Sequence, residues 1–246
     1  MGERMFTSRI PIDSAGVHVT DRHVFAPRPM IGCIGTAPAE GMNSTIIPSS
    51  AQGGNMDVTD CGPGSIVYLH VMVEGVYLSI GDIHAFMAEG GSSFIAIEAE
   101  GIAVVSVELR KGMNLRAPRV QTLIEWVFVG LGDPVQERIT RGYEDVFYFL
   151  VSDHGWDDGD AVAVMSAVGH SRLGGPTGSG TVVHYSFAAR RWILGGTRLA
   201  AAASASEEPP RCYRFKKWSR VRRCGTVSRS RSRPRSTPVN SLPEPW

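Results

Sequence analysis

The stretch GGNMDVTDCGPGSIVYLHVMVEGVYLSIGDIHAFMAEGGSSFIAIE, residues 53–98, decides how the rest of the chain can fold. It concentrates glycines, carboxylates and a histidine between apolar runs. Its middle part alternates between apolar and polar residues around a turn at Glu74 and Gly75, and this pattern predicts a pair of strands. We expect these strands to deliver residues 81–84 to a strand end, and a site to lie there.

Two polar side chains in this segment are expected to share a face. Asp82 and His84 are two residues apart, and side chains at that spacing point to the same side of an extended strand. Asp57, behind a Gly-Gly pair, and Glu98, at the end of another apolar run, would complete a cluster typical of a divalent-metal site. A turn aspartate and a surface histidine are the common alternatives, and the pattern alone leaves them open.

Four motifs in one order give this region a specific resemblance to the acetamidase/formamidase family. They are PMIGCIGTAP at 29–38, GGNMD at 53–57, GDIHA at 81–85 and IAIE at 95–98. The resemblance extends over roughly residues 10–168. It implies a hydrolase that converts linear amides, formamide or acetamide, to a carboxylate and ammonia.

Amide hydrolysis needs an activated water and a proton donor, because water is a poor nucleophile and the leaving nitrogen must be protonated. A divalent metal can activate the water, so we predict a metal cofactor, zinc or calcium. The predicted metal ligands are Asp57, Asp82, His84 and Glu98. The predicted catalytic groups are His84, Glu98 and Glu89, and the predicted substrate contacts are Gly54 and Asn55.

The chain departs from the family pattern directly after the histidine. Family members commonly run HAxQGDGE there, whereas this chain has Met87, Glu89 and Gly91 at the positions of Gln, Asp and Glu. Glu89 can keep the role of a carboxylate, but Gly91 cannot. Two interpretations therefore stay open: an active amidase, and a truncated, catalytically impaired homologue that folds without turnover.

The order of apolar patterns predicts a mainly β fold of the α+β class. We expect an antiparallel β-sandwich or barrel-like body with one or two helices packed on it. Further strands are expected at 101–112 and 123–130. An amphipathic helix is expected at 133–154 with Asp133 as its N-cap, followed by a shorter helix at 157–168.

Composition sets the domain organisation. With 246 residues and 43% hydrophobic content, the chain can bury one sizeable core. We predict a lead-in at 1–28, a catalytic core at 29–198 that is incomplete at both ends, and a basic, disordered tail at 199–246. The apolar runs are too short for a membrane span, and the N-terminus lacks the pattern of a leader peptide. We therefore expect a cytoplasmic protein. The four cysteines form no CxxC pair and are expected to be free thiols.

Charge is divided unevenly along the chain. Residues 1–210 hold 14 Lys and Arg against 23 Asp and Glu, and residues 211–246 hold 11 against 1. A nucleic-acid-binding protein is a third interpretation, but the acidic body lacks interleaved basic and aromatic residues. We therefore predict a small amide substrate as partner, no nucleic acid beyond weak anion binding by the tail, no membrane, and a homo-oligomer.

Overall fold

The computed structural model of the chain describes residues 8–44, 50–91, 95–132, 134–174 and 185–190. The predicted tail and Asp133 lie outside these residues. The strands are β1 Val17–Thr20, β2 His23–Phe25, β3 Met30–Gly35, β4 Gly53–Asn55, β5 Ile66–Tyr68, β6 Ser79–Phe86, β7 Ile97–Glu98, β8 Arg119–Gln121, β9 Glu125–Gly130, β10 Gly169–Leu173 and β11 Tyr185–Arg190. The helices are α1 Val135–Tyr148, the π-helical turn η1 Phe149–Asp153 and α2 Asp158–Val168.

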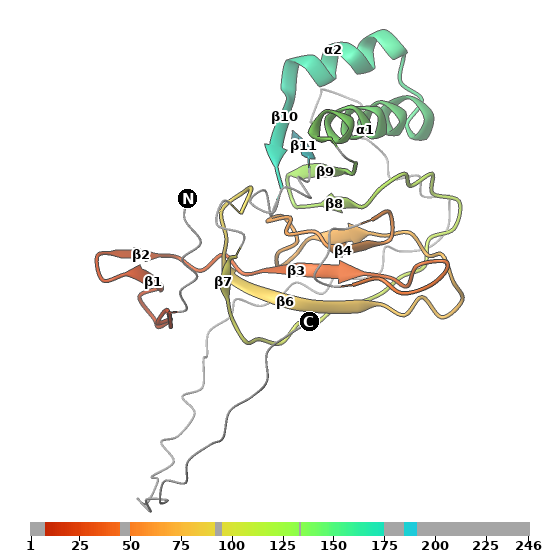
Figure 1. Cartoon of the computed structure of the whole chain (residues 1–246). Coiled ribbons are helices and arrows are strands. Elements are labelled where there is room, and N and C mark those ends of the chain that lie inside the picture. The colour runs from red at the N-terminus through yellow and green to blue at the C-terminus, as the bar shows by residue number, and fades with distance from the viewer. Residues whose placement is uncertain (1–7, 45–49, 92–94, 133, 175–184, 191–246) are drawn as a thin grey trace, which may run out of the picture. The chain divides into compact units, whose positions relative to one another are not determined.

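Two antiparallel sheets form the body of the described part. One has the strand order β10-β11-β9-β8-β5 and the other the order β4-β3-β6-β7, while β1 and β2 form a separate hairpin. A core of side chains joins the sheets, with Ile34 from β3, Val120 from β8 and Val127 and Val129 from β9. The predicted mainly β fold with packed helices is therefore confirmed (Figure 1).

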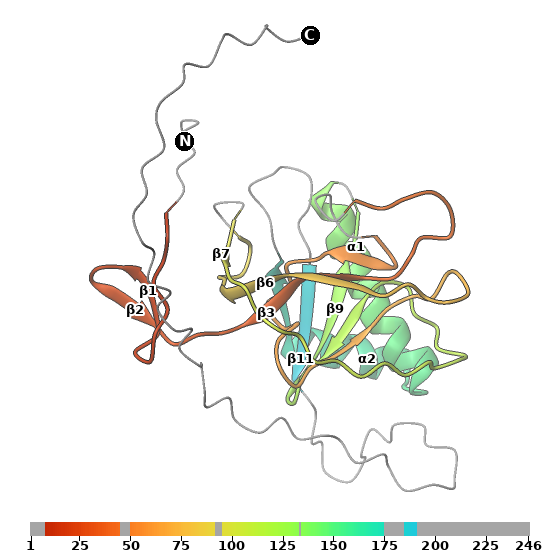
Figure 2. The same ribbon diagram turned by 90° about the horizontal axis from the view of Figure 1, so that it is seen from below.

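The helices cover the other face of the five-stranded sheet, where α1 lies against β9 and β11 (Figure 2). Phe128 points to that side and packs with Val146 and Leu150 of the helical segment. Successive side chains of β9 therefore point alternately into the core between the sheets and toward the helices. Both faces of this strand are covered. This explains why the run EWVFVG is apolar without strict alternation.

The helix predicted at 133–154 is present, but it changes its winding. It runs as an α-helix over Val135–Tyr148 and continues as a π-helical turn over Phe149–Asp153. The second helix begins as predicted, because the Asp157 side chain accepts hydrogen bonds from the backbone N–H groups of Gly159 and Asp160. None of the helices among the described residues is long and apolar enough to cross a membrane.

Two predictions about strands in the central stretch are wrong. The chain does turn at 73–76, where Val76 N–H donates to Val73 C=O, but β5 and β6 enter different sheets instead of pairing. Residues 81–84 consequently lie inside β6, which pairs with β3 on one side and β7 on the other, and not at a strand end.

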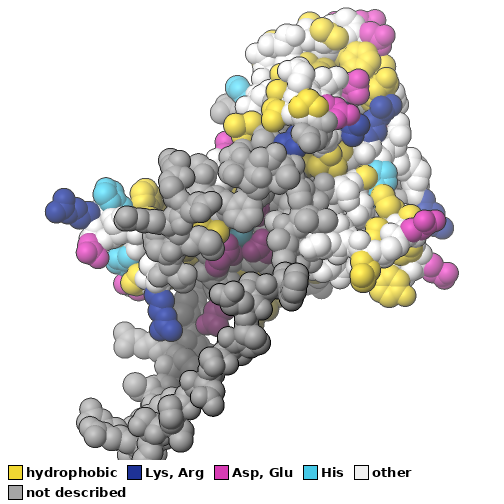
Figure 3. Space-filling view, in the orientation of Figure 1, with side chains coloured by type: hydrophobic (Ala, Val, Ile, Leu, Met, Phe, Trp, Pro, Cys, Tyr) yellow, Lys and Arg dark blue, Asp and Glu magenta, His cyan; other side chains and the backbone are white. Residues whose placement is uncertain are grey.

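The strand predicted at 101–112 is also wrong. The structure assigns no strand to residues 99–118, and the side chains of Ile102 and Val107 are 81% and 68% exposed. Figure 3 shows that hydrophobic side chains are exposed at several places on one face of the molecule. An alternating sequence becomes a strand only where a neighbouring strand can take its backbone hydrogen bonds, and this segment has no such neighbour among the described residues.

Candidate metal centre

Four chain segments meet at His84 because of how β6 pairs. In the register of the four-stranded sheet, Met30 of β3 lies opposite His84, and Glu98 of β7 lies opposite His84 on the other side. Asp57 follows β4, which pairs with β3. The sheet therefore brings the loop after β4, the middle of β6 and the end of β7 to one place.

The four predicted ligands lie close together. His84 Nε2 is 3.2 Å from Asp82 Oδ1, 3.3 Å from Glu98 Oε2 and 3.9 Å from Asp57 Oδ1. We call these four residues the His84 cluster. Spacing along the strand accounts for Asp82, and pairing between strands accounts for Glu98. Their role as metal ligands stays a prediction.

The His84 cluster is buried on one side and open on the other. The side chains of His84 and Asp57 are 3% and 9% exposed, whereas those of Asp82 and Glu98 are 35% and 56% exposed. A small molecule that approaches the cluster therefore meets Asp82 and Glu98 first, and His84 and Asp57 form the floor.

Two of the carboxylates stand on unusual backbone. Asp57 has φ 46° and Asp82 has φ 60°, both in the left-handed region that side chains other than glycine seldom adopt. Such a conformation costs about 1–2 kcal/mol per residue. Strain of this kind gathers at functional sites, and here it aims both carboxylates at His84.

Two carboxyl groups of the cluster, those of Asp57 and Glu98, have raised pKa values. Burial raises the pKa of Asp57, the charge of Asp82 raises it further, and His84 opposes the shift. Burial likewise raises the pKa of Glu98, again with His84 opposing and Asp82 adding to the rise. Both shifts arise mainly because burial disfavours the charged form of a carboxyl group, and the neighbouring Asp82 carboxylate adds to this effect.

Two buried polar atoms of the cluster make no hydrogen bond within the described part of the chain. They are Asp57 Oδ1 and His84 Nδ1. A buried acceptor without a partner costs free energy, so native structures seldom keep one without a reason. Asp57, Asp82 and His84 each offer one ligand atom, and these three atoms lie within 4.8 Å of one another. Such an arrangement can hold a cation.

The described contacts of the other predicted site residues are with parts of the chain outside the His84 cluster. Glu89 Oε1 accepts a hydrogen bond from Arg172 Nη1 at 2.9 Å, so its described contact is not with His84. Gly54 and Asn55 belong to β4, where they lie opposite Ile34 and Cys33 of β3. Their catalytic and substrate-binding roles stay predictions.

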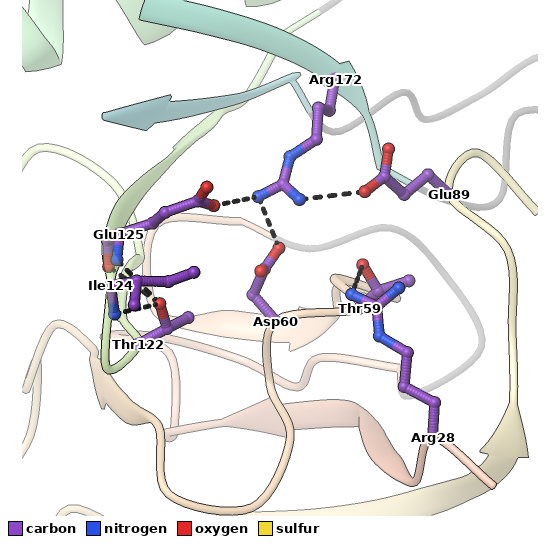
Figure 4. A network of polar contacts seen from close by, with 8 residues as sticks. All are labelled: Arg28, Thr59, Asp60, Glu89, Thr122, Ile124, Glu125 and Arg172. Atoms are coloured by element: carbon purple, nitrogen blue, oxygen red, sulfur yellow. Dashed lines mark hydrogen bonds and ion pairs between the residues drawn. The ribbon is translucent and has the colours of Figure 1, made fainter. Parts of the chain in front are cut away.

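Sequence reasoning missed the ionic group around Arg172, drawn in Figure 4. Arg172 Nη2 donates to Asp60 Oδ2 at 3.0 Å and to Glu125 Oε2 at 3.3 Å, in addition to its bond with Glu89. We call these four residues the Arg172 network. Arg172 lies just past the region of roughly residues 10–168 over which the family resemblance extends, and its partners are up to 112 residues away. No local sequence signal connects them.

The geometry defines a class of protein: a two-sheet, helix-covered β protein with a carboxylate–histidine cluster suited to a divalent cation. Residues 40–150 match the model of the Acetamidase/Formamidase family. Over this segment the chain thus matches the family that its motifs resemble.

Individual relatives agree with this assignment. The chain is 39% identical over 67 residues to an acetamidase from Mycolicibacterium smegmatis, a match that covers 27% of this chain and 16% of that protein. It also resembles the crystal structure of an acetamidase from Yersinia enterocolitica, with 34% identity, a TM-score of 0.64, and coverage of 74% of this chain and 53% of that one. For the acetamidase structure from Bacillus halodurans the identity is 25%, the TM-score 0.67 and the coverage 74% and 60%. The chain thus spans little more than half the length of its solved relatives.

Proposed function

We propose that this chain binds a divalent metal at the His84 cluster and uses it to hydrolyse small linear amides. The observation that supports this proposal is the convergence of Asp57, Asp82 and Glu98 on one imidazole nitrogen, all within 3.9 Å. The family adds the substrate class, because the relatives that match are named acetamidases.

The donor set fits zinc better than calcium. Zinc accepts imidazole nitrogen together with carboxylate oxygen, and its catalytic sites have three protein ligands and one open position. Calcium prefers about six to eight oxygen ligands. Asp57, Asp82 and His84 match the first description, and Asp57 Oδ1 is a buried oxygen that still needs a partner.

A bound divalent ion supplies positive charge that polarises an amide carbonyl and lowers the pKa of a water molecule. The chain's own contribution is to position groups and to move a proton. Glu98 suits the proton transfer, because its carboxyl is 56% exposed, lies 3.3 Å from His84 and has a raised pKa. It can therefore keep a proton for the leaving nitrogen. Glu89 is a weaker candidate, because Arg172 holds it.

Ammonia release from formamide and acetamide tests the proposal. The zinc-loaded parent should release ammonia, and Asp82→Asn should reduce the rate about 100-fold or more, because even residues behind a ligand affect activity 10–100-fold. Asp158→Asn removes the same charge from an exposed position in α2 and should leave the rate unchanged. Equal rates in Asp82→Asn and the parent would contradict the proposal.

The impaired homologue is the second interpretation, and it has its own signature. A parent that binds zinc but releases no ammonia from either amide would identify it. One observation favours it: Gly91 stands where the family carries a glutamate. A cytoplasmic location, a homo-oligomeric state and a lack of nucleic-acid binding stay predictions from the sequence.

A further inference from the structure

Gly32 of β3 lies directly beneath the His84 cluster. We propose that Gly32 is a positioning residue of the metal centre: its missing side chain creates the space in which Asp57, Asp82 and His84 converge. This inference rests on the proposed metal site and goes beyond it, because it assigns a role to a residue that is not itself a ligand.

The evidence is the space that a side chain at position 32 would need. A Cβ atom on Gly32 would lie 2.5 Å from Asp82 Oδ2, 2.7 Å from Asp57 Oδ1 and 2.9 Å from His84 Cε1. All three distances are far shorter than the contact of about 3.5–4.0 Å that non-bonded carbon atoms prefer. The three residues are the same three whose ligand atoms lie within 4.8 Å of one another.

The backbone of Gly32 also fixes one of the ligands. Its carbonyl accepts hydrogen bonds from the N–H groups of Met56 and Asp57, at 2.9 and 3.0 Å. Gly32 therefore holds the Asp57 backbone in place and at the same time leaves room for the Asp57 side chain. A larger residue could keep the first role, but it would lose the second.

Conformational freedom does not explain this glycine. Gly32 is absent from the glycines with positive φ, so an alanine could adopt its backbone conformation. The requirement is for space alone. Asp82 is the ligand that can yield, because it is 35% exposed whereas His84 and Asp57 are buried. An added Cβ should push the Asp82 carboxylate outward and open the cluster.

Gly35, three residues further along β3, provides a matched control. A Cβ there would lie 2.8 Å from Gly54 N and 3.0 Å from Gly53 C, which are backbone atoms of the adjacent β4. Alanine at position 35 should therefore disturb the pairing of β3 with β4, whereas alanine at position 32 should disturb the side chains of the metal centre.

The experiment measures zinc affinity by competition with a chelating dye, and thermal unfolding in EDTA and in zinc. The parent should bind zinc and gain a higher Tm from it. Gly32→Ala should unfold in EDTA near the parent Tm, bind zinc at least about 10-fold more weakly and lose most of the zinc-dependent rise in Tm. Gly35→Ala should unfold at a lower temperature in EDTA and keep that rise.

Each contrary result overturns a defined part of the inference. If Gly32→Ala binds zinc as tightly as the parent, the positioning role is wrong and the metal site stands. If the parent binds no zinc, the metal site and the positioning role both fall.

A double substitution keeps the test decisive if Gly32→Ala folds poorly. Because the shortest collision is with Asp82, adding Gly32→Ala to Asp82→Ala should lower zinc affinity and Tm less than adding it to the parent. Equal losses in the two backgrounds would overturn the role of Gly32.

Discussion

The ionic group around Arg119 has a centre as deeply buried as that of the His84 cluster, since the Arg119 and His84 side chains are 1% and 3% exposed, yet the protein completes the Arg119 group with its own atoms. Arg119 Nε and Nη2 donate to the two carboxylate oxygens of Asp145 at 3.0 and 2.7 Å, and Nη1 donates to Asp153 at 3.1 Å. The remaining bond of Nη2 goes to the carbonyl of Asn114. We call Arg119, Asp145 and Asp153 the Arg119 cluster.

The His84 cluster lacks such a balance. Three carboxylates surround a single imidazole, two buried atoms have no hydrogen-bond partner among the residues that the structure describes, and the pKa values of Asp57 and Glu98 are raised. The burial of the central residue therefore does not distinguish the Arg119 cluster from the His84 cluster. The two clusters differ in their balance of charge and hydrogen bonds, and a further cation would balance the carboxylates of the His84 cluster.

The largest effect is expected from breaking the balanced cluster. Asp145→Ala should lower the free energy of unfolding by about 3–5 kcal/mol, because it leaves Arg119 buried without its main partner. Urea unfolding followed by fluorescence measures this loss. Glu108→Ala, which breaks an exposed ion pair with Arg110, is the control and should change stability by less than ~1 kcal/mol. Similar losses in both variants would show that the Arg119 cluster does not stabilise the fold.

An intermediate effect is expected for the Arg172 network. Arg172→Gln removes the cation that Asp60, Glu89 and Glu125 share, and the side chains of Asp60 and Glu125 are only 10% and 17% exposed. The free energy of unfolding should fall by about 1–3 kcal/mol, and raising the salt concentration should recover part of it. A loss that is the same in low and high salt would argue against electrostatic repulsion among the three carboxylates.

A change in the His84 cluster should raise the free energy of unfolding of the metal-free protein, whereas the two changes above should lower it. The raised pKa of Asp57 means that the ionised carboxylate is less favourable in the folded, metal-free protein than in the unfolded chain. Its favourable contribution is complete below the unfolded pKa of about 3.9 and is lost as pH rises through the folded pKa. Asp57→Asn should therefore stabilise the metal-free protein by ~1 kcal/mol at pH 7 and by less near pH 4. Urea unfolding in EDTA at both pH values measures this, and a destabilised variant at pH 7 would contradict the account.

Sequence reasoning located the His84 cluster because two local rules apply there. Asp82 and His84 share a face through the two-residue period of a strand, and Glu98 ends a run that pairs with β6. The same period failed at 101–112, where the apolar residues alternate equally well but none of the described strands lies alongside. A pattern within one segment cannot reveal whether another segment will pair with it.

Long-range ionic pairs escaped prediction for a related reason. The spacing of apolar residues in the predicted helix at 133–154 indicated a buried face, and Val146 of α1 and Leu150 of η1 are buried. Asp145 is buried as well, because it meets Arg119, 26 residues earlier. The spacing of polar residues along the sequence does not indicate which residues they will contact. The space over Gly32 could be suspected from the glycines of PMIGCIG, but the side chains that fill it come from other segments.

Calorimetric titration of the metal-free protein with zinc tests the central claim most directly. The account predicts saturable binding of one ion per chain, and binding that weakens as the pH falls, because the carboxylate and imidazole ligands must be deprotonated. Asp82→Asn should weaken this binding at least about 10-fold. No saturable binding by the parent, or equal affinity in parent and Asp82→Asn, would contradict the assignment of the His84 cluster as a metal centre.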